Sequence, residues 1–190
     1  DELLKGGGIR VALTRNGDRY LLLEERSGIA RRLKADLFIS IHADSAGVGA
    51  AGATVYTLSE TASDAEAAKL AARENKADII NGVNLGGENA DVASILLDLA
   101  QRESMNDSSR FADLLKREGS AALKMRSDYH KTAGFAVLKQ PDMAAVLIET
   151  GYLTHESDVE RLYSPDGQKN IAVGVRKAVE IHFARRLASR

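Results

Sequence analysis

The chain has 190 residues, of which 44% are hydrophobic and 28% are charged, and its formal net charge at pH 7 is −1. This length and composition are typical of one globular domain with its own core. The near-neutral charge gives no electrostatic reason for binding nucleic acid or an anionic membrane surface. Cysteine is absent, which excludes disulfides and thiolate metal sites, and no apolar run is long enough to cross a membrane.

The beginning of the chain predicts a strand, a helix and a second strand. Residues 1–5 have the character of a helix end before three glycines, and residues 9–13 that of a strand. Apolar side chains then recur at helical spacing over residues 20–34, and the apolar run 36–41 ends at His42. Such a unit calls for a right-handed crossover and a parallel pair of strands.

The rest of the chain continues the α/β pattern. The further expected strands are 52–58, 133–138 and 144–148, and the expected helices are 63–80, 92–124 and 171–187. A break in the second of these helices is expected near Asn106 and Asp107. These elements predict a single α/β domain with a mainly parallel, mixed sheet that is flanked by helices on both faces.

Two apolar runs stop at residues that can carry chemistry. The first ends in His42, with Asp44 two residues later, and the second ends in Glu149 before Gly151. If the two strands are parallel neighbours, both side chains lie at the carboxyl edge of the sheet, where open α/β folds place their sites. An imidazole there can hold a metal and a carboxylate can activate its bound water. The alternatives are a hydrogen-bonding loop histidine at His42 and, at Asp44, a loop cap instead of a metal ligand.

A long connection follows the third expected strand. Residues 59–91 intervene where a short link would be enough, and long connections in compact domains are often lids or regulatory elements. Within it, Ala67, Ala71, Glu74 and Asp78 share one helical face by their spacing. Small residues beside acids would let this face approach a surface and present a carboxylate to a cation. An ordinary solvated acidic face has the same pattern.

Three segments resemble a known family. They are ADLFISIHAD at 35–44, GFAVL at 134–138 and VLIETGYLT at 146–154, and the resemblance extends over nearly the whole chain. They are similar to the zinc-dependent N-acetylmuramoyl-L-alanine amidases of type 3, in the branch involved in bacterial cell division. The resemblance implies that His42 ligates zinc and that Glu149 is the catalytic acid/base. The bond cleaved would join N-acetylmuramic acid to L-alanine of the peptidoglycan stem.

The same resemblance implies how the chain is organised. The family's first zinc-binding loop and a glutamate ligand precede the segment that begins at Asp1, so further ligands are expected upstream. Residues 1–190 are then expected to be a catalytic domain that lacks its first strand and that loop. Residues 59–91 are expected to be a regulatory helical insertion. Its autoinhibitory acid, held on the zinc until a partner removes it, would be Glu74, Asp78 or Glu88.

The implied cofactor is Zn²⁺, the substrate peptidoglycan, the partner an activator protein of the cell-division machinery, and the location the periplasm. Two other functions stay open. One is a zinc peptidase or deacetylase that acts on another amide, and the other is a peptidoglycan-binding or partner-regulating domain without catalysis. No H-E-x-x-H, G-x-S-x-G or phosphate-binding glycine loop is present, so a metal-activated water is the expected nucleophile.

Overall fold

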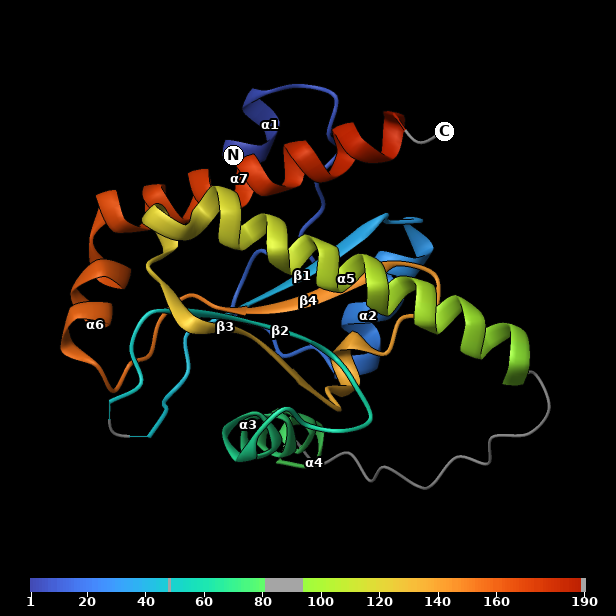
Figure 1. The fold of residues 1–190 in the computed structure, drawn as a ribbon, viewed down its shortest axis with the longest axis horizontal. Coiled ribbons are helices and arrows are strands. Elements are labelled where there is room, and N and C mark those ends of the chain that lie inside the picture. The colour runs from blue at the N-terminus through green and yellow to red at the C-terminus, as the bar shows by residue number, and fades with distance from the viewer. Residues whose placement is uncertain (48, 81–93, 189–190) are drawn as a thin grey trace.

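The structure, a computed structural model, describes residues 1–47, 49–80 and 94–188. Within these residues, a mixed sheet of four strands has the order β1-β4-β2-β3 (Figure 1). The strands are β1 (Leu37–His42), β2 (Ala53–Leu58), β3 (Met125–Ala133) and β4 (Ala144–Glu149). The β1–β4 and β2–β3 pairs are parallel, whereas β2 and β4 are antiparallel. The expectation of one α/β domain with a mixed sheet is confirmed.

Helices cover both faces of the sheet (Figure 1). They are α1 (Glu2–Lys5), α2 (Leu23–Arg32), α3 (Ala65–Asn75), α4 (Ala77–Ile80), α5 (Ser94–Leu123), α6 (Glu156–Tyr163) and α7 (Pro165–Ala188), with a 3₁₀ turn, η1 (Ala136–Leu138). The long helices α5 and α7 lie side by side on one face, and α2, α3 and α4 lie on the other. None of the helices in the described ranges is long and apolar enough to span a membrane.

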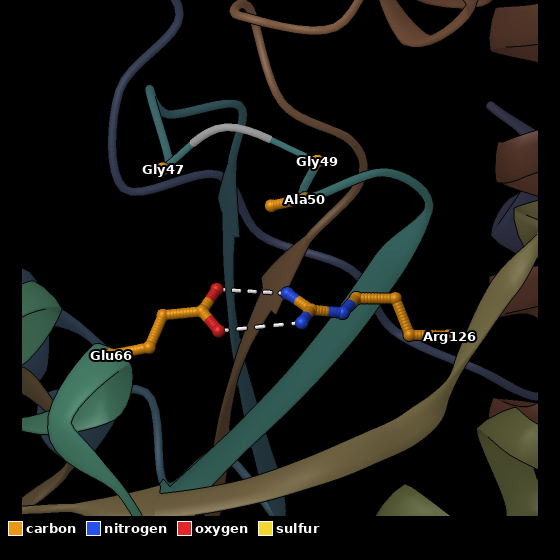
Figure 2. Close-up of a pocket in the computed structure, with 5 residues that line it drawn as sticks. All are labelled: Gly47, Gly49, Ala50, Glu66 and Arg126. Atoms are coloured by element: carbon orange, nitrogen blue, oxygen red, sulfur yellow. Dashed lines mark hydrogen bonds and ion pairs between the residues drawn. The ribbon is translucent and has the colours of Figure 1, made fainter.

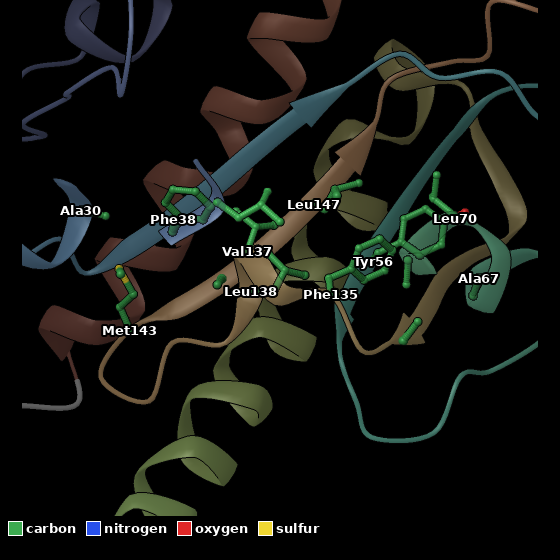
Figure 3. Close-up of a cluster of buried hydrophobic side chains, with 14 residues drawn as sticks. Ala30, Phe38, Tyr56, Ala67, Leu70, Phe135, Val137, Leu138, Met143 and Leu147 are labelled. Carbon is green, nitrogen blue, oxygen red and sulfur yellow. The ribbon is translucent and has the colours of Figure 1, made fainter. Parts of the chain in front are cut away.

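The alternation of side chains along the strands divides the core into two clusters. Phe38, Tyr56 and Leu147 point to the face covered by α2, α3 and η1 (Figure 3). Val55 and Ile148 point to the face covered by α5 and α7. All six residues of β4 are buried, which is the pattern of a strand covered on both faces. The strand that ends in Glu149 is therefore central.

Residues 9–13 do not form the expected strand. They are irregular and mostly exposed, and no described strand pairs with them. A strand needs a neighbour to share its backbone hydrogen bonds, and its apolar residues alone do not supply one. The parallel partner of β1 is β4 instead.

Two later expectations also differ from the structure. Residues 133–138 are not a strand, because β3 ends at Ala133 and η1 follows; the Asn75 side chain bonds the Gly134 carbonyl and the Ala136 N–H, at 2.8 Å each. Helix α5 continues through Asn106, which is exposed. A single polar residue weakens a helix by less than about 1 kcal/mol, and packing against α7 outweighs that cost.

Candidate metal centre and active site

The register of the sheet brings His42 and Glu149 together. They end β1 and β4, and they are direct partners in the parallel ladder. The chain after β4 stays attached to β1, because the backbone N–H and the hydroxyl of Thr150 both donate to the His42 carbonyl, at 3.0 and 2.8 Å. The expectation that both side chains lie at one carboxyl edge of the sheet is confirmed.

Three potential metal ligands meet at this edge. His42, Asp44 and Glu74 each offer one donor atom, and these atoms lie within 4.8 Å of one another. Nδ1 of His42 is 3.5 Å from Oε2 of Glu74 and 3.8 Å from Oδ2 of Asp44. Nε2 of His42 is 2.9 Å from the Ser40 hydroxyl, and this hydrogen bond orients the imidazole ring. One imidazole and two carboxylates are ligands that suit zinc and related metals.

Glu149 is fully buried beside this cluster. Its Oε2 accepts a hydrogen bond from the Asp44 N–H at 3.0 Å, but its Oε1 has no partner among the described residues. Burial, reinforced by the negative charge of Asp44, raises the pKa of Glu149 to about 9. A buried polar atom without a partner is unfavourable, and a bound cation with its water would relieve it. The arrangement therefore fits a metal centre with an adjacent acid/base.

Asp44 contacts both the loop and the metal cluster. Its carbonyl accepts from the Leu153 N–H at 2.8 Å, and its Oδ2 lies 2.8 Å from Arg73 Nη2 in an ion pair without hydrogen-bond geometry. Burial acts to raise the pKa of Asp44, but the neighbouring His42 and Glu149 side chains and the charge of Arg73 hold it below its usual value. Asp44 therefore makes contacts that fit both alternatives, a residue that holds the loop and a metal ligand.

The structure separates the acids of the inserted segment. Glu74, in the last turn of α3, faces His42, and burial raises its pKa. Asp78 points elsewhere: its carboxylate accepts from the Tyr20 hydroxyl at 2.6 Å and from the Leu23 N–H at 3.1 Å, at the start of α2. The helix is interrupted between α3 and α4, so the four-residue spacing does not keep Glu74 and Asp78 on one face. Glu88 lies outside the described residues.

A buried ion pair that sequence analysis missed supports this edge. Asp158 accepts from the Gly52 and Tyr152 N–H groups at 2.8 and 3.0 Å. Arg161 donates to the Thr150 carbonyl at 2.7 Å and to Asp158 at 3.0 Å. The pair ties the exit of β4 to the start of β2. Its three-residue spacing on a short amphipathic helix is also that of an ordinary surface pair, so the sequence carries no distinguishing signal.

The sheet, its helical layers and the histidine–carboxylate cluster define an α/β domain with a candidate metal site at one sheet edge. The chain belongs to the Amidase_3 family, N-acetylmuramoyl-L-alanine amidase, whose sequence profile matches residues 1–181. The resemblance stated from the sequence is therefore confirmed.

Relatives and solved structures agree with this assignment. The chain is 34% identical over 183 residues to the amidase AmiA of Escherichia coli strain K12, covering 95% of this chain and 63% of that protein. It is 32% identical over 182 residues to AmiC of Escherichia coli O6:H1, covering 95% and 43%. The chain thus spans about half the length of these relatives. The CwlD amidase of Clostridioides difficile, solved with the GerS lipoprotein, superposes with a TM-score of 0.66 at 18% identity, over 96% of this chain and 80% of that one, and so shares its fold.

Proposed function

We propose that this chain is the catalytic domain of a zinc-dependent N-acetylmuramoyl-L-alanine amidase. Its reaction would hydrolyse the amide between N-acetylmuramic acid and L-alanine in peptidoglycan. The observation that carries the proposal is the pairing of His42 with the buried Glu149 at one sheet edge, next to Asp44 and Glu74. Family membership supports the reaction class, and the geometry supports which residues perform it.

Each residue of the edge then has a chemical task. His42 would hold the metal through Nδ1, with Asp44 as a further donor and with additional ligands from upstream. A bound Zn²⁺ supplies an activated water and polarises the scissile carbonyl. The charge of a bound cation would favour the ionised form of Glu149. Glu149 would then take the proton of the attacking water and give it to the leaving nitrogen of L-alanine as the C–N bond breaks. Its buried position keeps that proton from bulk solvent.

Glu74 gives the domain a resting state. With its carboxylate beside Nδ1 of His42, it would occupy the coordination position that the reaction needs open. Residues 59–91 are in this proposal a regulatory insertion. An activator would work by binding the displaced form of α3 more tightly than the covered form, because equal affinity for both shifts no equilibrium. The lipoprotein complex of the CwlD amidase supports a protein partner for this fold.

The proposal includes a biological setting. We propose a role in remodelling the cell wall in the periplasm, with cleavage that separates daughter cells, and the similarity to the amidases AmiA and AmiC supports the cell-wall role. The activator would then belong to the cell-division machinery. Peptidoglycan is the substrate under this proposal.

The test is hydrolysis of purified sacculi by the full-length, zinc-loaded protein, alone and with Glu74→Ala so that inhibition does not hide activity. We expect mass spectrometry to find stem peptides with a free L-alanine amine and glycan strands with intact lactyl groups. Cleavage within the stem peptide would identify a peptidase, and loss of acetyl groups a deacetylase. Binding to sacculi without any cleavage, in both proteins, would identify a non-catalytic domain.

A further inference from the structure

The residues at this edge form a row across the sheet, with His42 on β1, Glu149 on β4, Thr54 on β2 and Arg126 on β3. Glu149 is opposite Thr54 of β2 in the antiparallel ladder. The pairing of β3 with β2 shifts at this level, and Arg126 lies in the irregular stretch. Nη1 of Arg126 is 3.4 Å from the Tyr152 hydroxyl, which donates to the Thr54 hydroxyl at 3.0 Å. Arg126 therefore belongs to the same edge as the candidate metal site, two strands beyond Glu149.

A cavity of about 360 Å³ opens beside Arg126 (Figure 2). Its wall includes Gly47, Gly49 and Ala50, from the loop that follows β1 and His42. Figure 2 shows the guanidinium pointing toward Glu66 of α3, with Nη1 2.8 Å from Oε1 and Nη2 3.3 Å from Oε2. The small side chains of the loop leave room on one side of this two-point ion pair.

Helix α3 places a carboxylate at each end of the row. Glu74 faces His42 on β1, and Glu66 faces Arg126 on β3. Their separation of eight residues corresponds to about 12 Å along a helix. Three strand spacings, from β1 to β3, correspond to about 14 Å. One helix therefore spans the row and covers both of its ends.

The charge at the β3 end depends on α3. Arg126 and the buried Lys131 are faced by three acids, and the contacts of Lys131 with Asp64, Glu66 and Asp128 are 3.1, 2.6 and 3.1 Å. Asp64 is the N-cap of α3 and Glu66 lies in its first turn, whereas Asp128 belongs to β3. With α3 in place the acids outnumber the cations by one. Without α3 the cations outnumber the acid by one, so the site becomes electropositive only when uncovered.

We propose that Arg126, supported by Lys131, binds a carboxylate of the substrate's peptide, and that Glu66 occupies this place while α3 covers the row. The proposal rests on the proposed amidase function. A guanidinium fork recognises a carboxylate through two parallel hydrogen bonds, the geometry that Glu66 already shows. Two strand spacings from Glu149 are about 10 Å, the length of about three extended residues. The recognised carboxylate therefore lies two or three residues beyond the scissile amide.

The test uses pairs of N-acetylmuramoyl peptides that differ only in a carboxylate or a carboxamide on the second or third residue. In the full-length, zinc-loaded protein we expect kcat/KM to favour the carboxylate by about tenfold to a hundredfold, mainly through KM. Arg126→Gln should abolish this preference, so that the carboxylate and carboxamide substrates have equal kcat/KM, whereas Arg126→Lys should keep part of the preference. Glu66→Gln should lower KM for the carboxylate substrate. Arg110→Gln, which removes an exposed arginine of α5, is the matched control.

The outcomes separate this proposal from the amidase function. If the parent cleaves both substrates and Arg126→Gln keeps the parent's preference, carboxylate recognition by Arg126 is overturned while the amidase function stands. If neither the parent nor Glu74→Ala cleaves either substrate, the amidase function fails, and calorimetric binding of the same two peptides to the parent and to Arg126→Gln tests carboxylate recognition by Arg126. A carboxylate preference in binding that Arg126→Gln removes supports the site, and equal binding overturns it. Thermal unfolding of each variant shows whether it is folded.

Discussion

The two sides of the candidate site are held in different ways. On the sheet side, His42 and Glu149 are placed by a parallel backbone ladder. Near them, Asp158 is 1% exposed and Arg161 8%. Asp158 accepts from the N–H groups of Gly52 and Tyr152, and Arg161 donates to Asp158 and to the Thr150 carbonyl. Removing one member of such a buried pair leaves an unpaired charge, so this side persists for as long as the domain is folded.

On the helix side, α3 is held by contacts that other groups can replace. Glu66 and Glu74 make ion pairs whose side chains are 34% and 17% exposed. The apolar residues that α3 buries are Ala67, Leu70 and Ala71, two of them with only a methyl group. Another carboxylate can replace the glutamate in such a partly buried ion pair, and small side chains bury little area. A rigid edge and an exchangeable cover therefore face each other across the site, so substitutions on the two sides should have different effects.

The largest expected effect comes from Glu149→Gln, which tests whether the rigid edge carries the chemistry. Glutamine keeps the shape but cannot transfer a proton, so kcat for muropeptide amide cleavage should fall by about 10²- to 10⁴-fold. Zinc content, measured by mass spectrometry of the metal, should be nearly unchanged. Retained turnover would remove Glu149 from the acid/base role, and loss of zinc would instead make it a ligand.

Asp158→Asn tests the support below the edge. Removing the charge beside Arg161 should lower the free energy of unfolding at pH 7 by about 3 kcal/mol. Burial acts to raise the pKa of Asp158, but hydrogen bonds from Tyr152 and Gly52 and the pair with Arg161 bring it below its usual value. The folded state therefore binds this proton less readily than the unfolded state. The stabilisation is fully present above the ordinary aspartate pKa of about 3.9 and is lost as pH falls through the folded pKa.

Urea unfolding of the Asp158→Asn variant and the parent at pH 7, 5 and 3 measures this effect. The difference between the two proteins should be constant from pH 7 to 5 and should shrink at pH 3. Asp142→Asn, which changes a 57% exposed acid, is the control and should shift stability by less than about 0.5 kcal/mol. A difference that does not change at low pH would mean that the charge of Asp158 is not what supports the edge.

Glu74→Ala tests the exchangeable cover. The variant loses the contact with His42 but keeps Glu66, so basal hydrolysis of dye-labelled sacculi without an activator should rise by about fivefold to tenfold. Parent and variant are compared at equal zinc occupancy. Glu60→Ala removes an exposed acid just before α3 and should change nothing. A folded Glu74→Ala protein with parental basal activity would leave residues 59–91 with a docking or packing role.

The smallest effect is expected from Asp78→Ala, which tests whether the cover formed by α3 also includes α4. Asp78 is 4% exposed and bonds the Leu23 N–H at the start of α2, so its loss should cost about 1 kcal/mol of stability, as for a helix cap. Basal hydrolysis should stay at the parental level, because the carboxylate does not face His42. A rise equal to that of Glu74→Ala would show that α4 belongs to the cover and not to the scaffold.

The sequence by itself determined the elements that carry the sheet edge. The apolar runs that end at His42 and Glu149 are short, continuous and followed by polar residues, so local patterns are enough to predict buried strands and their carboxyl ends. The sequence predicted the proximity of these two residues only on the condition that the two strands are parallel neighbours, and the structure meets that condition. The helical cover at residues 63–80 was recognisable from periodicity, although its interruption at Lys76 was not.

Only the tertiary structure decided which acid faces the histidine and which groups complete the edge. The interruption at Lys76 turns Asp78 toward α2 and leaves Glu74 over His42, and helical spacing alone could not separate them. The pair of Glu66 and Arg126 joins residues 60 positions apart through an irregularity of β3. Such contacts depend on how distant segments pack, because hydrogen bonds and ion pairs form between whichever side chains the packed backbone brings within reach, and local sequence patterns do not record that distance.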